Sequence, residues 1–308
     1  MGFIMKTRPQ APFFSKRRNR SALTALVVTA LLALTAVSVL SDTSEAAPTN
    51  YTIGGTDDLS GNWYPTLDAL LTANTLVDQD VITLLGNVSG TKGLSFTGIV
   101  NAGMVVVILL EGYTLTIETA GYGVNATHGK IDVRGPGTFN ITSTNSIGLY
   151  CNTGGSFVKN GNAIINVKGP TGVIVAGSGA GSPKKAEVTT VVSTNGNGVM
   201  ALDKGVVTVD GNVTATGESA VHAATVDSKV TVDGNVTVTG NYNAVEARLG
   251  GDVYVKGNVT ATAGTGACVS DNKGEITING KITAVTYIKL NGTVFTATDY
   301  NATSYKPG

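Results

Sequence analysis

Val207–Thr216 reads VTVDGNVTAT, and its pattern returns as VTVDGNVTVT from Val230, VYVKGNVTAT from Val253 and ITINGKITAV from Ile276. The first residues of successive copies are 23 positions apart. Self-similarity at a fixed period of this length is typical of a solenoid, in which each repeat forms one coil stacked on the next.

Strict alternation within each copy indicates β-strands. Val207, Val209 and Val213 point to one side of the chain, and Thr208 and Thr214 point to the other. A period of two predicts a strand with one buried face. A parallel stack gives equivalent residues the same surroundings in every coil, whereas hairpins would alternate their direction. We therefore expect a parallel β-solenoid in preference to a sandwich or propeller, with the central glycine at a corner.

Weaker copies extend the repeat toward the N-terminus. The corner glycines Gly86, Gly112, Gly135 and Gly161 follow one another at intervals of 23 to 26 residues. The stretch Ala176–Pro183 is rich in Gly, Ser and Pro and predicts a surface loop. The sequence thus predicts an all-β chain with about nine coils of 23–26 residues over 81–295, followed by a tail over 296–308.

One segment departs from the strand pattern. Pro65 can open a helix, and Leu67, Leu70 and Leu71 follow with the spacing of one helical face. A short helix over 65–74 would cover the raw strand edges at the start of the solenoid. We expect residues 47–80 to form this N-terminal cap.

The same region carries a resemblance to a known family. The run YPTLDALL from Tyr64 and the run DVITLLGNV from Asp80 resemble the opening of pectate-lyase-like β-helix proteins of microbial surfaces. In those proteins a short helix precedes a first strand of the form Asp-x-Ile-x-Leu. The resemblance implies a right-handed parallel β-helix with three sheets, of an adhesin-like or carbohydrate-binding, non-enzymatic kind.

The N-terminus has the order of a secretory signal. Six basic residues and no acidic residue occupy the first twenty positions, and an apolar run over Ala22–Leu40 follows. Small residues at Ser44 and Ala46 predict cleavage ahead of Ala47, which makes 1–46 a signal peptide. An uncleaved membrane anchor is the alternative, because the run is long enough to cross a bilayer. Both interpretations predict a secreted or cell-surface protein with no further membrane segment.

Charge argues against a nucleic-acid partner. Removing 1–46 takes away six of the 21 basic and two of the 21 acidic residues, which leaves 15 and 19 and a net charge of −4. Nucleic-acid binding normally requires the opposite sign.

The residues offer little for catalysis. Asp210 and Asp233 occupy equivalent positions in adjacent copies and could bind a cation or move a proton, but Asp before Gly is also a common corner residue. The next two copies carry Lys256 and Asn279 at this position. The histidines are His128 and His222, and the repeat places His222 in line with Glu246 and Val269, which is too little for a metal site. We predict no catalytic residue and no enzyme activity.

Acidic residues around the expected cap are the one candidate metal site. Asp57, Asp58, Asp78 and Asp80 could bind calcium if the fold brings them together, although polar loop and cap positions explain them more simply. No cofactor other than calcium is expected.

Trp63 and Tyr64 are the candidate ligand-binding residues. Exposed rings can stack on sugars, and these two are adjacent. The alternative is that the pair covers the end of the core.

Glycosylation is predicted at one repeated position. Asn212, Asn235 and Asn258 each begin an Asn-x-Thr sequon at the same place in three copies. Stacked Asn and Thr side chains also stabilise neighbouring coils without any sugar.

Both cysteines are expected to be unpaired. Cys151 and Cys268 lie about five coils apart, on the order of 24 Å at about 4.8 Å per strand, beyond the reach of a disulfide. The repeat aligns Cys268 with Val221 and Val245, which predicts a buried side chain.

These observations favour a secreted structural or adhesin-like solenoid that self-associates into fibres or matrix. The alternative is a carbohydrate-binding β-helix, with calcium as a further ligand, whose partner is a polysaccharide. A polysaccharide lyase or hydrolase is the third hypothesis.

Overall fold

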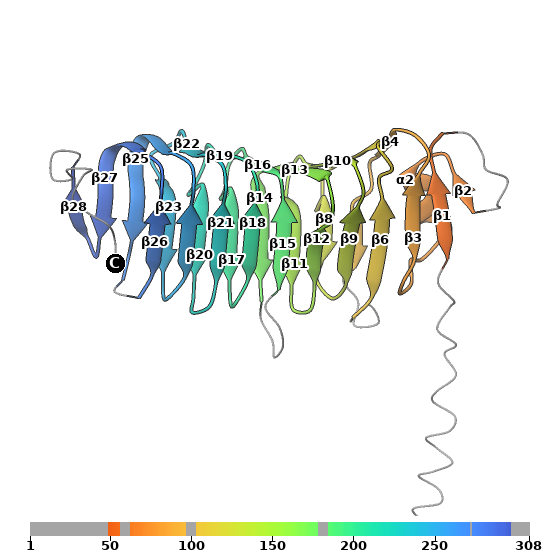
Figure 1. Cartoon of the computed structure of the whole chain (residues 1–308), viewed down its shortest axis with the longest axis horizontal. Coiled ribbons are helices and arrows are strands. Elements are labelled where there is room, and N and C mark those ends of the chain that lie inside the picture. Colours follow the sequence, from red (N-terminus) through yellow and green to blue (C-terminus); the bar gives the residue numbers. More distant parts are fainter. Residues whose placement is uncertain (1–48, 56–61, 97–102, 178–183, 272, 297–308) are drawn as a thin grey trace, which may run out of the picture. The chain divides into compact units, whose positions relative to one another are not determined.

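The computed structural model describes residues 49–55, 62–96, 103–177, 184–271 and 273–296, all within the unit Ala47–Gly308. These residues form a right-handed parallel β-solenoid of about eight turns, close to the nine coils expected (Figure 1). The predicted signal segment, its cleavage position and the tail from residue 297 lie outside the described residues.

The described strands stack in three columns, which we call the first, second and third faces. The first face is a sheet of eleven described strands in the order β2 (Trp63–Tyr64), β1 (Asn50–Ile53), β3 (Val81–Leu84), β6 (Val105–Leu109), β9 (Lys130–Arg134), β12 (Ser156–Lys159), β15 (Lys185–Val188), β18 (Val206–Val209), β21 (Lys229–Val232), β24 (Asp252–Val255) and β26 (Glu275–Ile278).

The other two faces belong to one sheet of 17 described strands. The second face begins with β4 (Val88–Gly90), β7 (Thr114–Thr119), β10 (Gly137–Ser143), β13 (Ala163–Gly169), β16 (Thr190–Ser193), β19 (Val213–Ala215) and β22 (Val236–Val238). The third face begins with β5 (Leu94–Phe96), β8 (Val124–Ala126), β11 (Ile147–Asn152), β14 (Thr171–Ala176), β17 (Val199–Leu202), β20 (Val221–Ala224) and β23 (Asn243–Arg248).

Two long strands join these faces at the C-terminal end. β25 (Val259–Val269) and β27 (Ile282–Leu290) each run through both columns, and β25 changes register against β27 between Ala261 and Thr265. The resemblance implies three sheets. The structure has three faces, and the second and third faces are joined into one sheet by β25 and β27.

The core is a set of internal ladders in the predicted alternation. Val207, Val230 and Val253 are in register on the first face and are buried. Thr208 and Thr231 each follow one of these valines along the strand, and they are in register with each other on the outer side. Burial of each valine side chain stabilises the fold by about 1.5–3 kcal/mol. Identical neighbours in successive coils make this contribution repeat along the stack.

The predicted helix is present as α2 (Leu67–Ala73). It begins two residues later than expected because Thr66 is the N-cap, whose Oγ1 accepts a hydrogen bond from the amide of Ala69 at 3.1 Å. Pro65 therefore lies before the cap and not in the first turn. Leu67 and Leu70 are buried against the core.

Helix α2 covers the outer edge of β4, as the cap interpretation predicts. A Cβ at Gly90 would lie 2.8 Å from Asp68 Oδ1 and 3.3 Å from Leu67 Cβ, so a side chain there would have to displace the Asp68 carboxylate. The Asp68 carboxylate accepts hydrogen bonds from the amides of Thr91 and Lys92. Burial would raise the pKa of Asp68, but these bonds outweigh it and hold the pKa below its usual value.

At the other end of the solenoid β28 (Thr293–Phe295) pairs antiparallel with β27.

Candidate functional site

Trp63 and Tyr64 lie on β2, at the N-terminal edge of the first face, and both are half-buried. The Trp63 indole Nε1 donates to the carbonyl of Gly54 at 2.9 Å. The Tyr64 hydroxyl accepts from Asn74 Nδ2 at 2.7 Å, and its ring lies 6.1 Å from that of Tyr51. These contacts join the strand edge to the end of α2, as the end-covering alternative describes. A role in ligand binding stays a prediction.

Asp78 and Asp80 accept backbone hydrogen bonds at the start of the solenoid. Asp80 is buried and accepts from the amides of Thr49 at 2.7 Å and Val77 at 2.8 Å. Asp78 accepts from the amide of Val105 at 2.7 Å. Asp57 and Asp58 lie outside the described residues. Within the described ranges, no three His, Cys, Asp or Glu side chains are grouped to hold a metal ion.

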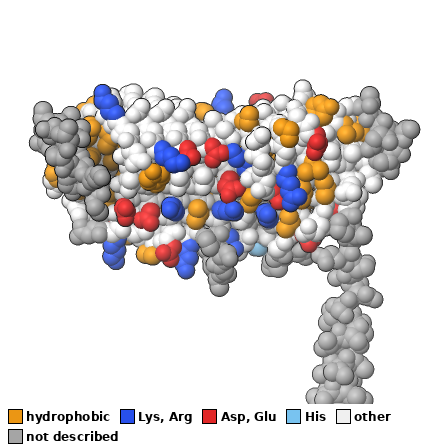
Figure 2. Space-filling view, viewed as in Figure 1, with side chains coloured by type: hydrophobic (Ala, Val, Ile, Leu, Met, Phe, Trp, Pro, Cys, Tyr) orange, Lys and Arg blue, Asp and Glu red, His pale blue; other side chains and the backbone are white. Residues whose placement is uncertain are grey.

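Asp210 and Asp233, the acidic pair considered for catalysis, each face a lysine. Asp210 pairs with Lys159 from two coils earlier, and Asp233 Oδ1 lies 2.8 Å from Lys256 Nζ in the next coil. Basic and acidic side chains are interspersed over the face shown in Figure 2. Exposed ion pairs of this kind stabilise a fold only slightly, but the lysine charge compensates the negative charge of each carboxylate.

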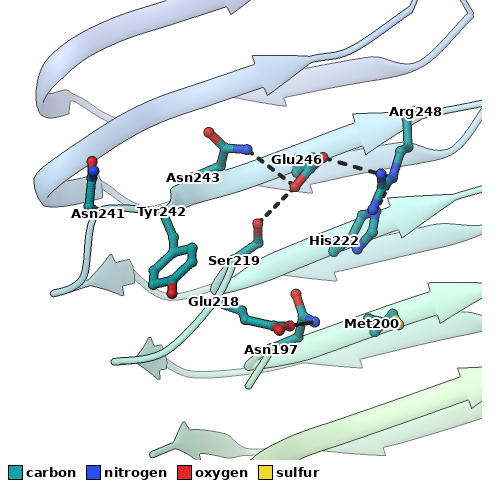
Figure 3. Close-up of a pocket in the computed structure, with 10 residues that line it drawn as sticks. All are labelled: Asn197, Met200, Glu218, Ser219, His222, Asn241, Tyr242, Asn243, Glu246 and Arg248. Atoms are coloured by element: carbon teal, nitrogen blue, oxygen red, sulfur yellow. Dashed lines mark hydrogen bonds and ion pairs between the residues drawn. The ribbon is translucent and has the colours of Figure 1, made fainter. Parts of the chain in front are cut away.

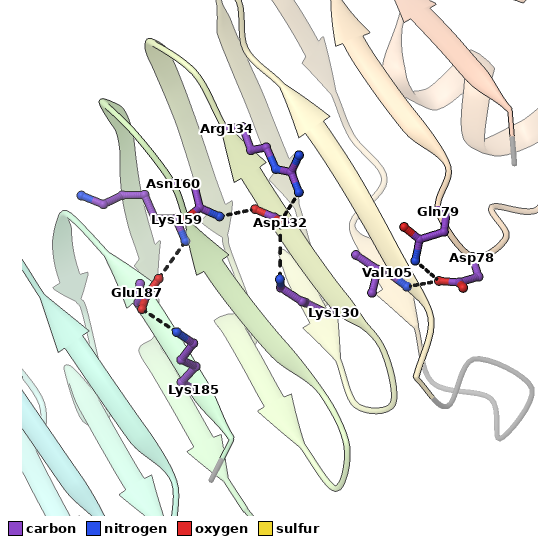
Figure 4. A network of polar contacts seen from close by, with 10 residues as sticks. All are labelled: Asp78, Gln79, Val105, Lys130, Asp132, Arg134, Lys159, Asn160, Lys185 and Glu187. Atoms are coloured by element: carbon purple, nitrogen blue, oxygen red, sulfur yellow. Dashed lines mark hydrogen bonds and ion pairs between the residues drawn. The ribbon is translucent and has the colours of Figure 1, made fainter. Parts of the chain in front are cut away.

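A denser network on the first face involves Asp132, which is buried (Figure 4). It accepts hydrogen bonds from Arg134 at 2.8 Å and from Asn160 at 2.6 Å. Burial would raise the pKa of Asp132, but these bonds and the charge of Lys130 outweigh it and hold the pKa below its usual value. The carboxylate is thus held ionised as a structural acceptor.

Asn212, Asn235 and Asn258 form the ladder that the repeat suggests. The Oδ1 of Asn212 accepts the amide of Asn235, the Oδ1 of Asn235 accepts the amide of Asn258, and the Oδ1 of Asn258 accepts the amide of Lys281, each at 2.8 Å. All three asparagines are exposed. Their structural role is therefore explicit, and their glycosylation stays a prediction.

A hollow of about 440 Å³ lies on the outer side of the third face and brings several polar side chains together (Figure 3). It lies over β17, β20 and β23 and over the corners that precede them. Its lining is mainly polar and consists of Asn197, Met200, Glu218, Ser219, His222, Asn241, Tyr242, Asn243, Glu246 and Arg248.

Tyr242 supplies the exposed ring of the hollow. It lies in the corner before β23, and 47 % of its surface is accessible. Glu218 and Asn197 come from the equivalent corners of the two preceding coils, where Asn197 Nδ2 donates to Glu218 Oε2. Three successive corners thus present a ring, a carboxylate and an amide to the same space.

Glu246 is held in place on β23. Its Oε2 accepts from the Ser219 hydroxyl at 2.8 Å and from Asn243 Nδ2 at 3.2 Å. Burial would raise the pKa of Glu246, but these bonds and the nearby Arg248 outweigh it and keep the pKa below its usual value. The hollow therefore contains a fixed, ionised acceptor.

His222 is a neutral acceptor at the floor of the hollow. Its Nε2 accepts a hydrogen bond from Arg248 Nε at 2.8 Å, so this nitrogen carries no proton. Burial lowers the pKa of His222 and Arg248 lowers it further, whereas Glu246 acts in the opposite direction without restoring it. The arrangement can bind hydroxyl and amide groups, because it offers both donors and acceptors in fixed positions.

The column that contains His222 differs from the one predicted. On the outer side of the third face Met200, His222, Glu246 and Cys268 are in register, so Cys268 replaces Val269. The alignment of Cys268 with Val221 and Val245 was wrong by one position, because the corner lengths on this face vary. Cys268 is nevertheless buried, as expected, and neither cysteine forms a disulfide.

The hollow was not predicted from the sequence, although two features of the sequence indicate an irregular third face. The buried positions of the third face follow one another at 22, 24 and 22 residues between Val199 and Ala267, unlike the constant 23 between Val207 and Ile276 on the first face. The run Gly240–Asn243, GNYN, also interrupts the Val and Thr pattern. An irregular corner rich in Asn and Tyr was the available clue.

Comparison with known proteins adds no relative. No family model, curated protein or solved structure matches the chain. The structure confirms the solenoid fold that the resemblance to pectate-lyase-like proteins implies, and no match supports membership of that family. Among the described helices, none has the length and apolar character needed to span a bilayer.

Proposed function

We propose that this chain is an exported, adhesin-like β-solenoid that acts by binding, and that the hollow around Tyr242 binds a saccharide. The observation that carries the proposal is the combination of an exposed ring with amides and carboxylates on three successive corners. The C–H face of a sugar packs on an aromatic ring, and its hydroxyl groups donate to carboxylates and exchange hydrogen bonds with amides.

The polar contacts within the hollow favour binding over catalysis. A general acid or base needs a proton that it can give or take near neutral pH. Ser219 and Asn243 hold Glu246 through its Oε2 and keep its pKa low, and His222 Nε2 accepts from Arg248, so neither group is placed to exchange a proton near neutral pH, while Glu246 Oε1 can still accept from a ligand. Both are better suited to positioning a ligand than to moving a proton.

Glycan-array screening of the purified protein, followed by calorimetry on the best ligand, tests the proposal. We expect Tyr242→Ala to weaken saccharide binding at least tenfold. Tyr113→Ala is the matched control, since Tyr113 is 39 % exposed but lies in the corner before β7, away from the hollow. Repeating the titration with a chelator tests the calcium dependence that the cap aspartates suggest. Failure of every saccharide to bind would overturn the proposal.

A second candidate function, self-association at the surface, is supported by the C-terminal edge of the first face. β26 is the last described strand in that sheet, and Ile276 and Ile278 on it are only partly buried. At the N-terminal end α2 covers the edge of β4 on the second face. This favours pairing between the C-terminal edges of two copies, which gives a closed dimer, over end-to-end pairing into an open fibre. Light scattering that shows only monomer at high concentration would exclude this candidate.

A further inference from the structure

An apolar track leads away from the hollow along the outer side of the third face. Tyr150, Ile174 and Met200 occupy the same outward position in three successive coils, and His222 follows in the fourth. Tyr150, Ile174 and Met200 are half-buried, and Met200 also lines the hollow. The track and the hollow are therefore one continuous surface.

A second aromatic platform stands at the far end of this track. Tyr122 is 41 % exposed and stacks on Tyr150, with ring centroids 5.6 Å apart and planes inclined by 22°. The hydroxyl of Tyr150 accepts from Asn152 Nδ2 at 2.7 Å, which holds this ring in place. Tyr122 occupies the corner before β8, the equivalent of the Tyr242 corner before β23.

The separation of the two platforms suits a chain of several sugar rings. Four strand steps separate Tyr150 from Glu246 in register, which is roughly 19 Å at about 4.8 Å per step. A single sugar in the hollow would not reach Tyr122. A linear polymer that lies across the strands would contact both.

The charges that line the hollow indicate which linear polymers it can bind. The hollow presents the carboxylates of Glu218 and Glu246, whereas Arg248 is the one cation among its described lining residues and lies 3.8 Å from Glu246. A polyanionic chain would place its acids against these carboxylates, which is unfavourable. Apolar side chains along the track add no charge.

We propose that the third face binds an uncharged linear polysaccharide that runs along the solenoid axis from the Tyr242 hollow to the Tyr122–Tyr150 pair. This inference rests on the proposed function, because it assigns the ligand class of the same hollow.

The test is the dependence of affinity on chain length. Calorimetry would compare a neutral disaccharide with the corresponding hexasaccharide, from the glycan that binds best, on wild type, Tyr122→Ala and Tyr113→Ala. We expect the hexasaccharide to bind wild type at least tenfold more tightly than the disaccharide. Tyr122→Ala should remove most of that gain and leave disaccharide affinity unchanged, and Tyr113→Ala should alter neither.

Each contrary result has a distinct meaning. Equal affinities for the two lengths in wild type, or an unchanged hexasaccharide affinity in Tyr122→Ala, would overturn the extended track while the hollow remains a saccharide site. Equally tight binding of an acidic uronate hexasaccharide would overturn the uncharged ligand class. Binding of neither neutral sugar would overturn the uncharged ligand class, and only failure of every glycan on the array would overturn the proposed function itself.

Discussion

The guanidinium of Arg248 donates through Nε to Nε2 of His222 at 2.8 Å, although both groups are basic. The contact requires a neutral imidazole, which burial favours, and the hydrogen bond is lost if His222 gains a proton. The stability of the third face is thereby linked to pH.

We expect stability to fall as the pH drops below about 6.5, the ordinary pKa of histidine. The unfolded chain then takes up a proton at His222 that the folded chain, with its lowered pKa, does not. The loss is at most about 1.4 kcal/mol per pH unit from this residue. Urea unfolding of wild type and His222→Gln between pH 5 and 7.5 checks it. The glutamine can accept from Arg248 without titrating, so equal pH slopes in the two proteins would contradict the prediction.

The asparagine ladder should contribute measurably to stability. Asn235→Ala removes the acceptor for the amide of Asn258 and should lower the free energy of unfolding by about 1 kcal/mol. Asn235→Asp keeps an oxygen acceptor and serves as the control, with most of the stability retained. An alanine variant as stable as wild type would show that water replaces the bond at no cost.

Close coil stacking should make Gly155 intolerant of any side chain. A Cβ there would lie 1.2 Å from the carbonyl oxygen of Ala126 in the preceding coil. Gly155→Ala should therefore destabilise the protein by about 3 kcal/mol or more, since the backbones must separate. At Gly121 an added Cβ meets nothing within 4 Å, so Gly121→Ala should change stability by less than about 0.5 kcal/mol. Similar melting temperatures for both variants would refute this account of the stacking.

Both thiols should be free and slow to react. Cys151 faces the core, where burial raises its pKa to about 12, and burial also raises the pKa of Cys268. Ellman's reagent should therefore release little product from the native protein and two equivalents after denaturation. Fewer than two equivalents from the denatured chain would reveal a disulfide and a different register.

Export and modification can be read from one intact mass. We expect the native protein to begin at Ala47, with the mass of residues 47–308. A mass that includes residues 1–46 would support the anchor alternative. Additional mass in multiples of sugar residues would indicate glycosylation, and its loss on treatment with an N-glycosidase would assign the glycans to sequons such as Asn235.

Much of the fold could be predicted because the relevant signals are local. The alternation around Val207 marks a strand, and its return at Val230 and Val253 marks a parallel stack. The leucines of α2 predicted a helix, whose start was placed two residues too early because Thr66 and not Pro65 forms the cap, and whose end was placed one residue too late because Asn74 is the C-cap. The predicted alignment of Cys268 was wrong because the 23-residue repeat does not give the length of the corner that precedes this residue.

The sequence by itself determined the coil period, the inward faces and the asparagine position, since the alternation within each copy and the constant spacing between copies can both be read from the sequence. The tertiary structure alone decided that Tyr242, Glu218 and Asn197 share a hollow and that Arg248 faces His222. These residues are 21 to 45 positions apart, in corners of unequal length. Which of them meet depends on how each coil is registered on the previous one, and that register is set by the packing of the core.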